Sequence, residues 1–160
     1  MTSQSGDLLE KILNEPKRLS PAQRRAVTCD RTHIRIIAGA GAGKTETLTR
    51  KIVYLLLVKG VDPSAIVAFT FTEKAAQGMK SRVYERVRHL GGEEICARLG
   101  EMFIGTIHGY CNRLLEEHFG YGDYGVLDEK QEMAYLMHVG WILGLGASGY
   151  YATNCEDFLN

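Results

Sequence analysis

A glycine-rich segment, Ala38 to Thr45, constrains the fold of this chain more than any other stretch. It reads Ala-Gly-Ala-Gly-Ala-Gly-Lys-Thr, follows the apolar run Ile34 to Ala38, and precedes a helical pattern from Lys44 to Val58. Glycines let successive backbone N–H groups turn inward around phosphate oxygens, and the following helix directs its positive end at the same anion. A strand, this loop and a helix in that order predict the phosphate-binding loop of a nucleoside-triphosphate-binding protein.

The residues of this loop have distinct expected roles. Lys44 can reach the β- and γ-phosphates, and the Thr45 hydroxyl can ligate Mg²⁺, so these two are the candidate catalytic residues. The backbone expected to surround the phosphates belongs to Gly39, Ala40, Gly41, Ala42 and Gly43. The alternative is a glycine-rich turn with an ordinary surface lysine, which the flanking strand and helix patterns argue against. The loop indicates a triphosphate, and it leaves the reaction open.

Alternating strand and helix patterns predict the fold class. Apolar runs at 34–38, 66–69 and 102–105 are expected to be strands, and helices are expected at 5–15, from Pro21, and at 44–58, 73–89, 108–118 and 128–143. Ser20 and Thr72 stand where N-caps of two of these helices would fall. The order predicts an α/β domain with a parallel sheet flanked by helices. Three strands are few for such a sheet, so we expect part of a larger domain.

Composition excludes several other classes of protein. The chain has 160 residues, of which 45% are hydrophobic and 24% charged, as expected for one globular domain rather than a disordered chain. It has no run of about 18 apolar residues, no apolar signal segment and no Cys-x-x-Cys pair, so we expect no membrane span and a reducing, cytoplasmic location. Through Leu115 there are 18 basic and 11 acidic residues, and after it 1 and 8. This gradient fits either a polyanion partner on one side or a chance distribution.

Two further motifs have competing interpretations. Gly144 to Gly149 spells G-x-G-x-x-G, but only 11 residues follow it, so we interpret it as a loop and expect the tail beyond Gly144 to be mobile. Asp128-Glu129 could be the acidic pair that binds Mg²⁺ and activates water in a P-loop ATPase. Asp128 followed by Gln131 is also a helix-capping pattern, and we favour that second interpretation.

Two segments around the phosphate loop resemble superfamily-1 DNA helicases of the UvrD/Rep/PcrA type. Leu19 to Val27 resembles the family's Q motif, whose glutamine reads the adenine edge, and Gln23 stands at that position. Ala38 to Thr45 is similar to motif I, where the family commonly has alanine first; the departure is Ala42, where serine is usual. The resemblance therefore implies ATP and Mg²⁺ as cofactors, with Gln23 in contact with the adenine base of ATP. Gln23 would also cap the helix that Ser20 begins, so the two roles compete for one side chain.

Two later segments resemble the motifs with which this family meets single-stranded DNA. Thr70 to Ala76 is similar to motif Ia, with Glu73 where asparagine is frequent, and Gly105 to His108 is similar to motif Ib. The resemblance implies that Phe71 stacks on a base and that Lys74 offsets phosphate charge. The remaining residues that it implicates in nucleic-acid binding are Thr70, Thr106 and His108. Taken alone, Phe71 would be a core aromatic, Lys74 a solvated lysine and His108 a capping or core histidine.

The resemblance covers about residues 19 to 140 and implies an α/β, RecA-like partial domain at 1–125, followed at 126–160 by the start of a helical inserted subdomain. It implies the N-terminal portion of an ATP-dependent DNA helicase or translocase, working 3′-to-5′ on single-stranded DNA with C-terminal helicase domains as partners. By itself the chain is expected to bind nucleotide without efficient hydrolysis. The alternatives are a nucleotide-binding module, or another P-loop ATPase or kinase that uses Asp128-Glu129.

Overall fold

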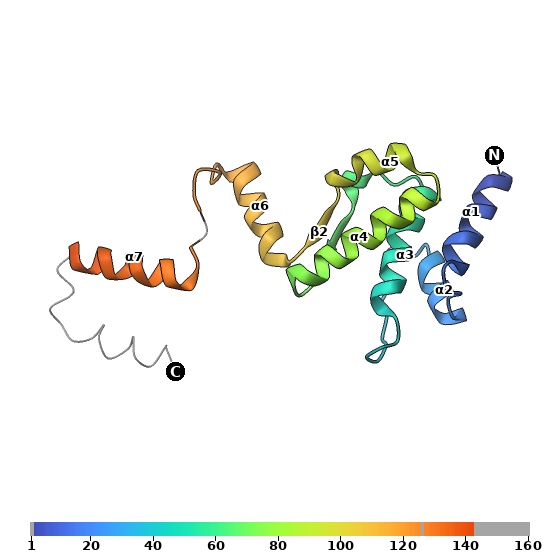
Figure 1. Ribbon diagram of the computed structural model, residues 1–160, viewed down its shortest axis with the longest axis horizontal. Helices are drawn as coiled ribbons and strands as arrows, with labels where there is room; N and C mark the ends of the chain where they lie inside the picture. Colours follow the sequence, from blue (N-terminus) through green and yellow to red (C-terminus); the bar gives the residue numbers. More distant parts are fainter. Residues whose placement is uncertain (1, 126, 143–160) are drawn as a thin grey trace. The chain divides into compact units, whose positions relative to one another are not determined.

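The computed structural model describes residues 2–125 and 127–142 (Figure 1). Its helices are α1 (Thr2–Asn14), α2 (Pro21–Thr28), α3 (Lys44–Leu57), α4 (Glu73–His89), α5 (Glu93–Arg98), α6 (Ile107–Phe119) and α7 (Glu129–Ile142). Its strands are β1 (Val67–Phe69) and β2 (Phe103–Gly105), and two 3₁₀ turns span Pro63–Ala65 and Leu99–Glu101. The predicted mobile tail after Gly144 lies outside the described residues. Within them, no helix is both long and apolar enough to cross a bilayer.

Contacts divide the chain into two compact units, Met1–Leu114 and Leu115–Asn160, which we describe separately. The first unit contains both strands and the helices up to the start of α6. The second contains the end of α6 and α7. The domain boundary expected after residue 125 stays a prediction.

The predicted α/β class is confirmed by the parallel pairing of β1 with β2. Val67 lies opposite Phe103, and Phe69 lies opposite Gly105. The chain crosses from one strand to the other through α4, the connection that parallel strands require. Both α3 and β2 pack against α4, and the core between them is apolar. Its buried side chains include Val53, Leu56, Ala68, Ala76, Met79, Val83, Val87 and Ile104.

The helix starts fall where the capping signals predict them. In α2, the Ser20 Oγ accepts from the Gln23 backbone N–H at 3.3 Å, and the Gln23 Oε1 accepts from the Ser20 N–H at 2.9 Å. In α4, the Thr72 hydroxyl accepts from the Ala75 N–H at 3.2 Å. These bonds satisfy N–H groups that have no partner within the helix, so short-range sequence signals are sufficient to fix these ends.

The strand predicted at 34–38 is wrong for the described structure. These residues have no regular secondary structure, and Ile34, Ile36 and Ile37 are exposed, the last to 84%. A strand is stabilised by hydrogen bonds to a neighbouring strand, and among the described residues no strand pairs with this run. The apolar pattern alone therefore does not make it a strand. The short helix α5 was not predicted, because its six residues are too few to show a helical period.

The guanidinium group of Arg50 fastens α1 to α3. Its side chain is 1% exposed, and its Nη1 donates to the carbonyls of Ile12 and Leu13 at 3.0 and 3.1 Å. Its Nη2 donates to the Lys17 carbonyl at 2.7 Å, and its Nε donates to the Glu46 carboxylate at 2.6 Å. These carbonyls lie at and beyond the end of α1, where a helix leaves its last carbonyls without internal partners. Arg50 therefore ends α1 and positions the chain that leads into α2.

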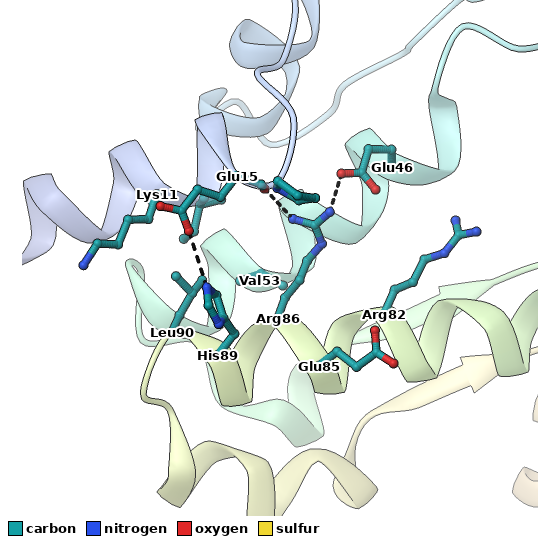
Figure 2. Close-up of a pocket in the computed structure, with 11 residues that line it drawn as sticks. Lys11, Glu15, Glu46, Val53, Arg82, Glu85, Arg86, His89 and Leu90 are labelled. Carbon is teal, nitrogen blue, oxygen red and sulfur yellow. Dashed lines mark hydrogen bonds and ion pairs between the residues drawn. The ribbon is translucent and has the colours of Figure 1, made fainter.

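Arg86 makes a second connection from α4 (Figure 2). One guanidinium nitrogen donates to the Glu15 carbonyl at 3.0 Å, and another pairs with the Glu46 carboxylate. Burial lowers the pKa of Arg86, and the neighbouring Glu46 opposes that shift. Glu46 is thus held from two sides, by Arg50 on its own helix and by Arg86 on α4. A cavity of about 440 Å³ lies beside this pair, between α1, α3 and α4.

We predict that Arg50→Met lowers the free energy of unfolding by about 3 kcal/mol, because it leaves buried carbonyls and one carboxylate interaction without the guanidinium. Urea unfolding followed by circular dichroism measures this loss. The matched control is Lys59→Met, which also removes a cation from an ion pair, with Asp30, but at an exposed position. An equal effect of the two substitutions would contradict the anchoring role of Arg50.

Candidate nucleotide and nucleic-acid site

The phosphate loop occupies residues 38–43 and leads directly into α3, as predicted. Gly41 and Gly43 have φ values of +74° and +79°, in the left-handed region that side chains other than glycine rarely adopt. The Thr47 N–H donates to the Gly43 carbonyl at 2.9 Å and thereby closes the first turn of the helix. Gly41 and Gly43 therefore adopt the backbone torsions that a phosphate-binding loop needs.

Lys44 points back over its own loop. Its Nζ donates to the carbonyls of Ala38 and Gly39 at 2.9 and 2.7 Å. An ammonium group carries three N–H donors, so one donor stays available after these two bonds. These two bonds hold the positive charge of Lys44 against the start of the loop, where it suits a phosphate ligand.

Gln23 joins α2 to the phosphate loop. Its Oε1 accepts from the Ser20 N–H, and its Nε2 donates to the Ala42 carbonyl at 3.0 Å. The capping role of this side chain is therefore present, together with a loop contact that sequence reasoning missed. Contact with an adenine edge would require the amide to exchange one of these bonds. The adenine role of Gln23 stays a prediction.

Two cavities flank the Glu46–Arg86 pair. One, of about 410 Å³, is lined by Gln23, the loop residues 41–43 and the chain from Pro16 to Leu19. The other, drawn in Figure 2, has no phosphate-loop residue in its lining. Of these two cavities, only the first is lined by residues of the phosphate loop. Pro16, Glu46 and Arg86 line both cavities.

The residues present fit a phosphate-bound Mg²⁺ only in part. Thr45 is exposed at the first turn of α3, where its hydroxyl could serve as a ligand. Across residues 2–125 and 127–142, no group of three or more His, Cys, Asp or Glu side chains could hold a metal ion. Asp128 and Gln131 instead form a capping box: the Asp128 Oδ1 accepts from the Gln131 N–H at 2.8 Å, and the Gln131 Oε1 accepts from the Asp128 N–H at 3.0 Å. The capping interpretation of Asp128 is therefore the one that the structure favours.

The residues expected to contact nucleic acid gather where β1 and β2 end. The Thr70 N–H donates to the Gly105 carbonyl at 2.9 Å, which extends the strand pairing to the start of both loops. Phe71 is fully exposed and packs on nothing, whereas a core phenylalanine would be buried. Lys74 and His108 are exposed as well. In Figure 1 the amino ends of α3 and α4 lie on the same side of this unit, so this cluster and the phosphate loop share that side.

Three aromatic rings support these strand ends. The Tyr110 ring lies 4.9 Å from the ring of Phe103 and 5.4 Å from that of Phe69, centroid to centroid. The start of α6 is thereby packed on both strands. The loops that carry Phe71 and Thr106 consequently begin at residues that this ring packing holds in place.

Thr106 has a partner that sequence reasoning missed. Its hydroxyl donates to the Glu73 Oε1 at 2.9 Å and accepts from the Gly109 N–H at 3.1 Å. The first bond links the loop after β2 to the first turn of α4. The sequence carries no signal for it, because the two residues are far apart in the chain. The Glu46–Arg50 ion pair, by contrast, has the i, i+4 spacing that could have revealed it.

A phosphate loop ahead of a helix, in an α/β unit with parallel strands, defines the class of P-loop nucleotide-binding proteins. Within this class the chain belongs to the UvrD/REP helicase family, because residues 19–137 match the N-terminal domain of that family. The matched segment contains the glutamine, the phosphate loop and both strand-end loops.

Relatives of this chain have names that describe DNA helicases. It is 37% identical to a probable DNA helicase of Mycoplasma pneumoniae over 70% of its own length, and 37% identical to DNA helicase II of Salmonella typhimurium over 74%. It is 39% identical to the ATP-dependent DNA helicase UvrD1 of Mycobacterium bovis over 82%. The aligned part makes up 20%, 16% and 17% of these relatives, respectively. The chain thus spans about a fifth or less of their length.

Alanine substitutions of three loop glycines are expected to have graded effects. Gly39→Ala should be nearly neutral, because nothing lies within 4 Å of the added Cβ and φ is not positive. Gly41→Ala should destabilise by about 1 kcal/mol through its positive φ alone. Gly43→Ala should cost more, because its Cβ would also lie 2.7 Å from the Gln23 Nε2. Thermal unfolding of the three variants gives the order, and a Gly39→Ala variant as unstable as Gly43→Ala would contradict it.

Proposed function

We propose that this chain is the ATP-binding portion of an ATP-dependent DNA helicase or translocase that moves 3′-to-5′ on single-stranded DNA. The observation that carries this proposal is the convergence of Gln23 and Lys44 on one phosphate loop. Membership of the UvrD/REP family and the names of the relatives support the reaction. The parent protein would act in the cytoplasm, and its C-terminal helicase domains would be the partners of this portion.

Each loop residue has a role in this proposal. The backbone of residues 39–43 would hold the triphosphate, and Lys44 would offset the charge that develops on the γ-phosphate. Thr45 would help to hold Mg²⁺, which neutralises phosphate charge when bound. Gln23 would select adenine by exchanging the loop carbonyl for the base edge. The base would then lie in the cavity between residues 16–19 and the loop.

The strand-end cluster would bind the DNA strand. Phe71 would stack on a base, Lys74 would offset phosphate charge, and Thr70, Thr106 and His108 would contact the backbone. The basic balance through Leu115, with 18 Lys and Arg against 11 Asp and Glu, supports a polyanion on this unit. DNA and nucleotide would then meet the same side of this unit (Figure 1).

We propose further that the chain by itself binds nucleotide without efficient hydrolysis. A P-loop ATPase needs an acidic residue to bind Mg²⁺ and another group to activate water. The candidate pair Asp128-Glu129 stands at the cap of α7, where Asp128 already bonds to Gln131. The second candidate function, an ATPase or kinase that uses this pair, would require the cap to open.

Lys44→Ala is expected to lower the affinity for ATP at least about tenfold, because it removes the cation that faces the phosphates. Fluorescent-nucleotide titration of the 160-residue chain measures this loss, and Lys80→Ala, an exposed lysine of α4, is the matched control. ATP turnover by the wild-type chain, with and without single-stranded DNA, should not exceed that of Lys44→Ala.

Two outcomes would change the proposal. Mg²⁺-dependent turnover that Glu129→Gln abolishes would support the second candidate function. In the longer protein, Lys44→Ala should abolish unwinding, and normal unwinding by that variant would contradict the helicase proposal.

Phe71→Ala is expected to weaken binding of single-stranded DNA about fivefold to a hundredfold, the loss of one base stacked on an aromatic ring. It should leave the unfolding temperature unchanged, because the ring is fully exposed. Fluorescence anisotropy with a labelled oligothymidine measures the affinity. Tyr84→Ala, which removes a partly exposed ring of α4, is the control, and equal effects of both variants would contradict the stacking role.

A further inference from the structure

The Glu73–Thr106 hydrogen bond occupies a group that the proposed function assigns to DNA. A carboxylate can only accept a hydrogen bond, so the Thr106 hydroxyl must be the donor across their 2.9 Å contact. A hydroxyl has a single proton to donate. While this bond is made, Thr106 has no proton left for a phosphate oxygen.

The acceptor side of the same hydroxyl is also engaged. The Gly109 N–H donates to the Thr106 Oγ1 at 3.1 Å, which orients the hydroxyl toward Glu73. A Cβ added at Gly109 would lie 3.3 Å from that oxygen and 3.8 Å from the Glu73 Oε1. The hydroxyl, the carboxylate and the Gly109 backbone therefore form one packed contact, which joins the loop after β2 to α4.

Glu73 also places a negative charge among the residues expected to meet phosphates. It is exposed, and its neighbours in the chain are Lys74 and the loop that carries Phe71. An acidic side chain at the first turn of α4 is favourable for the helix, so the folded chain tolerates this charge. The same charge repels a phosphate that approaches the Thr106 hydroxyl.

We propose that Glu73 limits single-stranded DNA binding, because a phosphate must displace its carboxylate from the Thr106 hydroxyl. The inference rests on the proposed function and adds to it a residue that lowers the affinity for DNA. DNA binding becomes an exchange of one anion for another at a single donor. Each strand that contacts Thr106 must make this exchange, so Glu73 lowers the affinity of the surface for phosphate.

Glu73→Gln separates the charge from the side chain's shape. The amide keeps an oxygen that can accept from Thr106 but removes the negative charge. We expect this variant to bind a labelled oligothymidine about threefold to tenfold more tightly at low salt, with the gain shrinking as salt screens the charge. Glu85→Gln, which makes the same change at an exposed position about three turns further along α4, should bind like the wild type.

Glu73→Ala removes both the charge and the acceptor and so frees the Thr106 proton. It should bind at least as tightly as Glu73→Gln, and adding Thr106→Val to it should cancel the part of the gain that the free hydroxyl provides. Binding equal to the wild type, or weaker, in both Glu73 variants would overturn the inference and leave Glu73 as a structural tie. Unfolding temperatures measured on the same samples exclude loss of fold as the cause of weaker binding.

The design separates this inference from the proposed function. If the wild type binds and Phe71→Ala weakens it, while the Glu73 variants match Glu85→Gln, only the inference fails. If the wild type does not bind but Glu73→Gln does, both are supported. If none of the variants binds the oligothymidine, DNA binding by this surface is wrong and the inference fails with it.

Discussion

The buried guanidinium of Arg50 is the interaction on which the placement of the nucleotide residues depends. It is held by Glu46 from its own helix, and it donates to three backbone carbonyls at and beyond the end of α1. A buried charge is tolerated only when its N–H groups have hydrogen-bond acceptors. Here most of the acceptors are main-chain carbonyls that are distant from Arg50 in the sequence. The last of these carbonyls belongs to Lys17, close before the cap of α2. The Ser20 cap sets the residue at which α2 starts, and Arg50 holds the chain before that cap and so helps to position Gln23.

The phosphate loop is then held by polar bonds from both of its sides. Gln23 reaches it from α2, and Lys44 reaches back over it from α3. Glycine torsions supply the path of the loop, while these two side chains hold its carbonyls. On the proposed function, ATP would therefore enter by exchange of existing hydrogen bonds. Such a loop is partly organised before its ligand arrives, which lowers the entropic cost of binding.

The opposite arrangement holds at the strand ends. Phe71 is left without packing partners, whereas Thr106 is tied to the first turn of α4 by Glu73. The parallel pairing of β1 and β2 places the loops that follow them at one edge of the sheet. The packed rings of Phe103 and Tyr110 hold the residues at which these loops begin. On the proposed function, Phe71 is ready to stack on a base, whereas the Thr106 hydroxyl must first release Glu73.

The sequence by itself determined the features that depend on neighbours along the chain. Ser20 and Thr72 predicted helix starts because capping joins residues three positions apart, and the glycine-lysine-threonine segment predicted a phosphate loop because its torsions are local. The strand predicted from the apolar run 34–38 was wrong, because a strand needs a neighbouring strand that no local pattern can supply. Only the tertiary structure decided that Arg50 bonds to the carbonyls at the end of α1 and that the Glu73 carboxylate accepts from the Thr106 hydroxyl. Both contacts join residues more than 30 positions apart in the chain. The side-chain types show which groups are able to form hydrogen bonds, but only the folded chain brings particular donors and acceptors together.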